Sequence, residues 1–200
     1  QVHVRNRKVC FWPYGYNSFH CDVTGQLKEG SNDIVVLLEN SEQSSRWYPG
    51  AGLYRKVRHI TQPQVHVPVW GTYVTTPHIG KEHAVVSVRT KIEGVEKGSA
   101  VTLKTRILDA GGHAVACVTD TRLLHFGEIE QTLTVENPTL WSPESPVMYF
   151  VETEVYAGGS VNTDWNMDRP EISIADGTVP CDKVSTRFGF RTIEIIPDKG

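Results

Sequence analysis

Residues 84–93, AVVSVRTKIE, decide the fold class of this 200-residue chain. Apolar and polar side chains alternate along the stretch: Val86, Val88 and Ile92 share one face, and Ser87, Arg89, Lys91 and Glu93 share the other. A period of two is typical of an extended strand that buries one face. The stretch therefore predicts a half-buried β-strand.

The same alternation recurs farther along the chain. Val101, Leu103 and Ile107 alternate with polar residues over 100–108, and Tyr149, Val151 and Val155 alternate with glutamates over 149–155. Gly111-Gly112 and three prolines, at 138, 143 and 146, mark turns between such runs. No long window carries an apolar helical stripe that is free of Gly or Pro. Short strands with this spacing predict an all-β protein built from sandwiches.

A domain boundary is expected near Thr61-Gln62-Pro63, where a strand-like run ends at a proline. The piece after it, 63–200, is large enough to bury its own core. The piece before it, 1–62, has about four strands, which is marginal for an independent sandwich. We therefore expect two β units of unequal stability.

Composition excludes several functional classes. Apolar residues make up 39% and charged residues 22%, and the net charge is −3, so no basic surface for nucleic acid or a membrane is expected. No run is long and apolar enough for a membrane span. Because Gln1-Val2-His3-Val4 reads as a strand and not as a signal peptide, and no Met begins the chain, we expect it to start inside a longer protein.

The four cysteines, Cys10, Cys21, Cys117 and Cys181, form no C-x-x-C pair and have no zinc-ligand spacing. We expect buried free thiols, because free cysteine packs as a small hydrophobic residue. A disulfide between Cys10 and Cys21 stays open as the alternative.

Motifs for catalysis and metal binding are missing from the sequence. It has no G-x-S-x-G, H-E-x-x-H, P-loop or G-x-G-x-x-G. His78 and His83 lie five apart with no third ligand nearby, so surface histidines are expected and no metal site. Glu152 and Glu154 are the nearest match to a carboxylate pair. Because they alternate with apolar residues, a solvated strand face is expected and not a catalytic pair.

Two stretches carry a resemblance to a known family. The first comprises 11–24, 27–32 and 45–57, and the second comprises 137–149 and 185–193. The first resembles the last half of the N-terminal sugar-binding jelly roll of family 2 glycoside hydrolases, of the β-galactosidase type. The second resembles the closing strands of the immunoglobulin-like domain that follows it in that family. The resemblance implies an all-β chain: a partial jelly-roll (galactose-binding-like) sandwich over 1–62, then an immunoglobulin-like β-sandwich over 63–200.

The resemblance also implies a function. The chain is expected to be the non-catalytic accessory region of an enzyme that hydrolyses terminal β-galactosides with retention, without a cofactor. The catalytic barrel would follow Gly200 and hold both catalytic glutamates, so no catalytic residue is expected here. Arg46 and Trp47 are the candidate substrate-binding residues, because this loop lies near the sugar pocket in family members. The alternative is a freestanding carbohydrate-binding or adhesin-type module without enzymatic activity.

Expected partners follow from the same resemblance: a β-galactoside and the absent barrel in the intact enzyme, no nucleic acid and no membrane. Because strands of the jelly roll would be absent, the fragment is expected to self-associate through exposed edges and apolar surface. An exported bacterial parent fits the family, although no residue establishes the compartment.

The sequence departs from the family pattern in three places. The first hairpin has Asn6-Arg7 where the family has Asn-Gly, so Arg7 needs a positive φ or the turn differs. Cys10 stands where a glycine is usual. The segment 158–180, which contains Trp165, Asp164, Asp168 and Asp176, is longer than usual.

Aromatic residues and arginines in the motifs have structural expectations. Six aromatic residues are expected to pack in a core or between domains: Trp12, Tyr14, Tyr16, Trp141, Phe188 and Phe190. Arg55 and Arg191 are expected to pair with carboxylates or to stack on aromatic rings.

Overall fold

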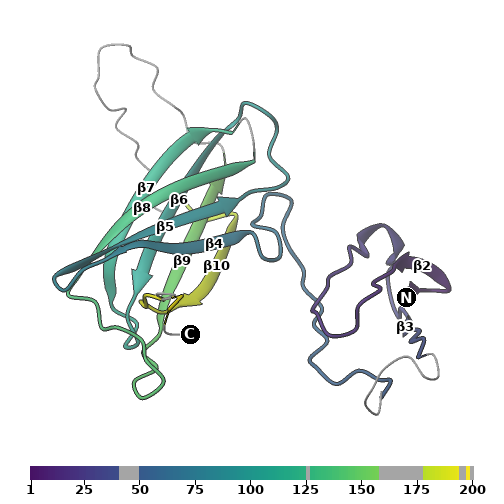
Figure 1. Ribbon diagram of the computed structural model, residues 1–200. Coiled ribbons are helices and arrows are strands. Elements are labelled where there is room, and N and C mark those ends of the chain that lie inside the picture. The colour runs from purple at the N-terminus through teal and green to yellow at the C-terminus, as the bar shows by residue number, and fades with distance from the viewer. Residues whose placement is uncertain (41–49, 125–126, 158–177, 194–196, 199–200) are drawn as a thin grey trace. The chain divides into compact units, whose positions relative to one another are not determined.

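The computed structural model describes residues 1–40, 50–124, 127–157, 178–193 and 197–198. The chain divides into two compact units, Gln1–Ile60 and Thr61–Gly200, called unit 1 and unit 2 below. Within the described residues the only helix is a 3₁₀ turn at Thr24–Gln26. Every ladder between named strands is antiparallel. The prediction of an all-β protein is confirmed (Figure 1).

Unit 1 contains a three-stranded sheet in the order β2-β1-β3. Its strands are β1 (Val2–Val4), β2 (Arg7–Cys10) and β3 (Ile34–Val36). Among the described residues of this unit, the buried apolar ones are Val2 and Val4 in the central strand, with 8% and 0% of their surface exposed. Since two valines bury little area, the sheet contributes little hydrophobic stabilisation.

The hairpin between β1 and β2 turns at Arg5 and Asn6, one residue earlier than the expected Asn6-Arg7. Arg5 and Asn6 have φ values of 49° and 63°, and Val4 pairs with Arg7. Two consecutive positive φ values are typical of a type I′ turn, whose twist matches that of a two-stranded ribbon. Asn tolerates this conformation well. The shift of the turn removes the need for a positive φ at Arg7 and places that unfavourable conformation at Arg5 instead.

Unit 2 is a sandwich of two sheets (Figure 1). One sheet has the order β10-β9-β6-β7 and the other β4-β5-β8. The strands are β4 (Thr72–Ile79), β5 (His83–Lys91), β6 (Ala100–Leu108), β7 (Ala114–Leu123), β8 (Glu128–Glu136), β9 (Tyr149–Ala157) and β10 (Asp182–Phe188). The alternation predicted along 84–93 is confirmed, because Ala84, Val86 and Val88 are fully buried.

The core of unit 2 falls into two apolar clusters drawn from both sheets. One contains Val86, Ile107, Leu133, Val151 and Phe190, and the other contains Val67, Leu103, Ile129 and Val155. Val67 and Phe190 lie outside the named strands, but the other residues come from strands of both sheets, so their packing holds the sheets together.

A polar layer separates the two clusters. Thr105, Gln131 and Thr153 are buried and each lies between residues of the two clusters on its own strand. Thr105 Oγ1 donates to Gln131 Oε1 at 2.6 Å and lies 3.1 Å from Thr153 Oγ1. Gln131 Nε2 donates to Leu103 O at 3.3 Å and to Asp120 Oδ2 at 3.0 Å. The buried amide is therefore satisfied on all sides, as burial requires.

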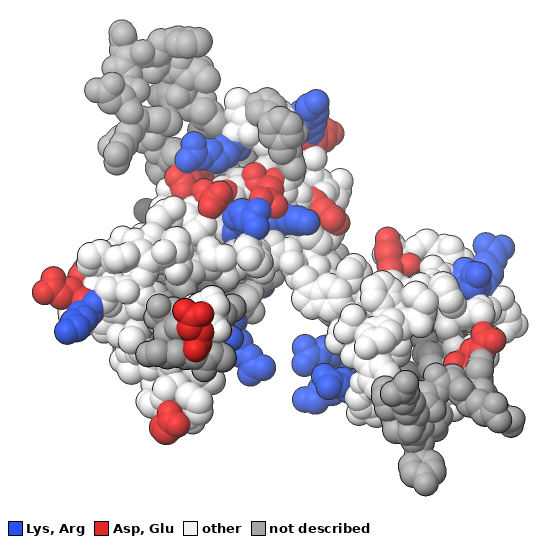
Figure 2. Space-filling model, in the orientation of Figure 1, with Lys and Arg blue, Asp and Glu red and all other residues white. Residues whose placement is uncertain are grey.

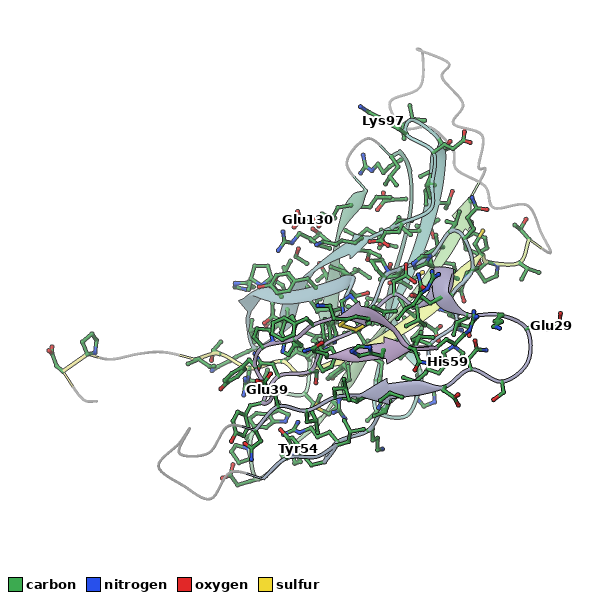
Figure 3. All side chains as sticks on the ribbon, turned by 90° about the vertical axis from the view of Figure 1, so that its right-hand side faces the viewer. Glu29, Glu39, Tyr54, His59, Lys97 and Glu130 are labelled. Carbon is green, nitrogen blue, oxygen red and sulfur yellow. A yellow bond between two sulfur atoms is a disulfide. The ribbon has the colours of Figure 1, made fainter. Side chains whose placement is uncertain are left out.

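The expectation of four buried free thiols is wrong, and the alternative of a disulfide between Cys10 and Cys21 is confirmed. Cys10 and Cys21 form a disulfide, with their Cα atoms 5.9 Å apart, because the chain after β2 folds back within bonding range (Figure 3). Cys117 and Cys181 are free but exposed, not buried. Cys117 is opposite Arg106 in the pairing of β6 and β7, and so shares the outer face of the sheet. Within the described residues no helix is long and apolar enough to cross a membrane.

Candidate functional site

The two residues predicted to bind substrate, Arg46 and Trp47, lie in 41–49, outside the described residues. The long segment with Trp165, Asp164, Asp168 and Asp176 also lies outside them, apart from 178–180. The structure resumes at Gly50, and Tyr54 follows with 65% of its surface exposed (Figure 3). The Arg55 guanidinium lies 5.4 Å from the centre of the Tyr54 ring, so the expected stacking of Arg55 is confirmed.

The second motif brings together segments that are far apart in sequence. Leu140 and Phe190 form a parallel bridge, and Trp141 N donates to Phe190 O at 2.8 Å. The Arg191 guanidinium stacks over the Trp141 ring at 5.1 Å, so its aromatic partner is Trp141 and not the neighbouring Phe190. This arrangement joins the loop before β9 to the end of β10 in one small cluster, here called the motif cluster.

Gly189 allows this approach. A Cβ atom at Gly189 would lie 3.1 Å from Trp141 Cβ, closer than side chains normally pack. Phe190 is fully buried and meets Tyr149 edge-on, with ring centres 4.8 Å apart. The predicted core role of Phe190 is therefore confirmed, whereas Trp141 and Phe188 are partly buried.

The aromatic residues of the first motif do not lie in the core of unit 1, which corrects that part of the expectation, while their packing between domains stays a prediction. Trp12, Tyr14 and Tyr16 are 44%, 54% and 60% exposed. Trp12 stacks on Phe19 with ring centres 5.8 Å apart and nearly parallel planes. Their rings contact one another and not a buried interior, because the part of unit 1 that the structure describes has few buried residues against which they could pack.

Glu152 and Glu154 do not form the solvated face expected from their alternation. Both lie on the outer face of β9, yet their side chains are only 16% and 12% exposed. Arg106 Nη2 donates to Glu152 Oε1, and to Glu154 Oε1 at 2.7 Å. Lys183 Nζ lies 2.9 Å from Glu152 Oε2. Cations from the neighbouring strands β6 and β10 cover the carboxylates because the strand register places them side by side.

The electrostatics of this cluster oppose acid catalysis. Burial alone would raise the pKa of Glu152, but the hydrogen bond from Lys183 and the charge of Arg106 outweigh it, so the pKa lies below 4.5. The hydrogen bond to Glu152 raises the pKa of Lys183 above 10.5. Burial and the neighbouring Glu154, to which its hydroxyl donates, raise the pKa of Tyr156 above 10. A general acid needs a raised carboxyl pKa, so Glu152 is suited to ion pairing and not to proton donation.

The outer surface of unit 2 carries mixed charge. On the face shown in Figure 2, acidic and basic side chains lie interspersed and do not form one patch of a single sign. On the sheet β4-β5-β8, Arg89 stacks on Tyr73 at 4.7 Å and pairs with Glu128 at 3.6 Å. Such a surface offers no broad field for a polyanion.

An open depression of about 370 Å³ lies at one end of the sandwich. Buried Val135 and Tyr149 contribute apolar lining, and Asp109, Glu136 and Asn137 contribute polar lining. The carboxylate of Asp109 already accepts hydrogen bonds from the backbone of Gly111 and His113. These bonds, with that of His113 foremost, lower the pKa of Asp109. Asp109 therefore serves to stabilise the turn whose backbone it binds.

The histidine pair closes the β4–β5 hairpin. The rings of His78 and His83 lie with their centres 5.2 Å apart. Within the part of the chain that the structure describes, no group of three or more His, Cys, Asp or Glu residues is placed to hold a metal ion.

Comparisons with known proteins point to one family of enzymes. The model of the family "Glycosyl hydrolases family 2" matches residues 65–168. A β-galactosidase of Bacteroides ovatus is 37% identical over 161 residues, covering 78% of this chain and 19% of its own. An inferred β-glucuronidase of Formosa agariphila is 32% identical over 194 residues, covering 96% of this chain and 16% of its own.

A solved structure shows the same arrangement of strands. A glycosyl hydrolase family 2 member from Bacteroides cellulosilyticus superposes with a TM-score of 0.77 and 28% identity, covering 100% of this chain and 25% of that one. The class is thus an all-β region of the kind found in family 2 glycoside hydrolases. The chain belongs to glycosyl hydrolase family 2. It spans 16% and 19% of the length of the two curated relatives described above.

Proposed function

We propose that the longer protein carrying this chain hydrolyses terminal β-galactosides with retention of configuration, and that this chain is its accessory region. The observation that supports the substrate class is the 37% identity to a β-galactosidase, which exceeds the 32% identity to the β-glucuronidase relative. Retention requires two facing carboxylates about 5–5.5 Å apart. Glu152 and Glu154, held by Arg106 and Lys183, do not supply that pair, so the catalytic carboxylates lie elsewhere in the protein.

In this proposal, residues 1–62 are the C-terminal part of the sugar-binding jelly roll and 63–200 are the immunoglobulin-like sandwich. Arg46 and Trp47 line the sugar pocket of the barrel in the intact enzyme. An arginine donates paired hydrogen bonds and an indole offers a flat apolar face, which together suit a pyranose ring. Unit 2 supports the barrel as a rigid, well-packed sandwich.

The test compares nitrophenyl β-galactoside with nitrophenyl β-glucuronide on the longer protein. We expect a kcat/KM at least ten times higher for the galactoside. A preference for the glucuronide contradicts the substrate class. The 200-residue chain alone should release no nitrophenol from either substrate.

Arg46 and Trp47 are tested in the longer protein with Arg46→Ala and Trp47→Ala. Each should raise KM for the galactoside, since a lost hydrogen bond or stacking contact costs about 1–3 kcal/mol. Arg55→Ala is the matched control, because Arg55 stacks on its own neighbour Tyr54. Equal effects of Arg46→Ala and Arg55→Ala would reject a pocket role for Arg46.

A further inference from the structure

A β-bulge in β4 turns His78 towards the outer face of the sheet β4-β5-β8. Before the bulge, Thr75 is opposite Ser87. After it, His78 is opposite Val85, so β4 contains one residue more than β5 over this stretch. Without the extra residue His78 would be opposite Ala84, which is fully buried. Because successive strand residues point to opposite faces, the bulge moves the His78 side chain from the core face to the outer face.

His83 lies on the same outer face, two residues before Val85 on β5. It is therefore a diagonal neighbour of His78 across the two strands, a position from which ring side chains can meet. Both side chains are exposed, and their ring centres are 5.2 Å apart. Within the part of the chain that the structure describes, no hydrogen bond or ion pair engages either ring, whereas His66 and His113 each have a polar partner.

The separation of the two rings suits a shared metal ion. Two imidazoles bound to one tetrahedral ion have ring centres about 5 Å apart, because each metal–nitrogen bond is about 2.0–2.1 Å long. Gly80, in the turn of the hairpin, leaves the approach to His78 open. A Cβ atom at Gly80 would lie 3.2 Å from His78 Nε2, closer than side chains normally pack.

The charges around the pair favour a cation. Glu136 is opposite His83 in the pairing of β5 with β8, and the hairpin turn contributes Lys81 and Glu82. One positive and two negative side chains therefore belong to the surroundings of the rings, so the balance of charge attracts a cation. Among cations, imidazole suits transition-metal ions such as Zn²⁺, Cu²⁺ and Ni²⁺.

We infer that His78 and His83 form a two-histidine site for a divalent transition-metal ion, with water completing its coordination, and that the bound ion links the end of edge strand β4 to β5. The site has two protein ligands, so it differs from the clusters of three or more that the described residues lack. It replaces the expectation drawn from sequence spacing, because spacing does not show the bulge that brings the rings together. The site is independent of the proposed hydrolase activity, since neither ring belongs to the residues of that proposal.

The first experiment titrates Zn²⁺ calorimetrically into the full chain carrying Cys117→Ser and Cys181→Ser, which removes exposed thiols that would compete for zinc. We expect one Zn²⁺ per chain. His78→Ala and His83→Ala should each weaken binding by about 10–100-fold or more, because losing even an outer partner of a metal ligand costs that much. His113→Ala, which removes an exposed histidine outside the hairpin, is the matched control and should leave the affinity unchanged. An affinity that either hairpin variant retains, or no saturable binding by the parent, overturns the inference.

The second experiment measures hydrogen exchange of the Gly80 amide, which donates to His83 O at 2.8 Å. At a Zn²⁺ concentration 100 times the Kd, this exchange should slow by about 100-fold, because the hairpin end must release the ion before it opens. The Gly98 amide, in an exposed turn elsewhere in unit 2, should keep its rate, and His83→Ala should abolish the slowing at Gly80. Equal Gly80 exchange with and without Zn²⁺ overturns the link between the two strands.

Discussion

Replacing Gln131 with leucine tests whether the polar layer stabilises unit 2 or only interrupts its core. Gln131 is 2% exposed and makes hydrogen bonds to Thr105, Leu103 and Asp120. The two bonds to neutral groups are worth about 1 kcal/mol each. The Asp120 side chain is 26% exposed, so water replaces part of its bond, and we assign it about 1 kcal/mol as well.

Burial of the apolar leucine side chain offsets about 1.5 kcal/mol of this loss, the low end of the range for burying such a side chain. The carbonyl of Leu103 is left without its side-chain partner in a dry interior, which adds to the loss. Thr105 keeps its contact with Thr153. We expect a net destabilisation of about 2 kcal/mol, equivalent to a shift of about 1 M in the urea midpoint.

The assay is a double-mutant cycle with Thr105→Val, followed by urea titration with circular dichroism. Gln131→Leu and Thr105→Val together should cost about 1 kcal/mol less than the sum of the single variants, because their shared hydrogen bond is lost only once. Additivity within about 0.3 kcal/mol would show that the Thr105–Gln131 bond contributes nothing. A Gln131→Leu variant more stable than the parent would refute the argument altogether.

Phe190→Ala should lower the stability of unit 2 by about 3–5 kcal/mol in the same titration, because the ring is fully buried. Phe188→Ala, at a partly buried ring, should lower it less, and equal losses would contradict the packing argument. Because the pKa of Glu152 is depressed in the folded protein, its stabilising contribution is present above its ordinary pKa of 4.5 and is lost as the pH falls through the folded value. Glu152→Gln should remove this loss of stability at acid pH, and an unchanged profile of stability against pH would contradict the role of Glu152. The full chain should show concentration-dependent association in sedimentation equilibrium at about 100 μM, while residues 61–200 stay monomeric, because unit 1 exposes large apolar side chains; a strictly monomeric full chain would rule this out.

The strands of unit 2 could be predicted from the sequence because burial of one face makes apolar and polar residues alternate over a short stretch. Val86 and Val88 in β5, and Val101 and Leu103 in β6, are buried at alternate positions, so a few residues of sequence are enough to predict which face of each strand is buried. The two compact units divide between Ile60 and Thr61, and the domain assignment drawn at Pro63 stays a prediction.

Contacts that depend on register could not be predicted. Nothing near Glu152 in sequence shows that Arg106 and Lys183 become its neighbours, because the pairing of β9 with β6 and β10 sets that arrangement. The same holds for Cys10 and Cys21, whose spacing allows a bond without requiring one. The turn at Arg5-Asn6 was missed because a shift of one residue follows from pairing geometry and not from composition.

The candidate site was only partly open to prediction. Stacking by Arg55 and Arg191 was expected, but the partner of Arg191, Trp141, lies 50 positions away in sequence and comes close only through the bridge between Leu140 and Phe190. Arg46 and Trp47 remain predictions from a resemblance.

The pairing of β9 with β10 gives this protein a natural place for inserted sequence. Val155 is opposite Asp182, and Cys181 N donates to Val155 O at 2.7 Å, so the chain leaves and re-enters the sheet at adjacent points. Once both ends are fixed, each doubling of the intervening length costs only about 0.6 kcal/mol in closure entropy. Relatives can therefore lengthen or shorten this connection with little change in the sandwich, and a reporter peptide placed there would leave the paired strands intact.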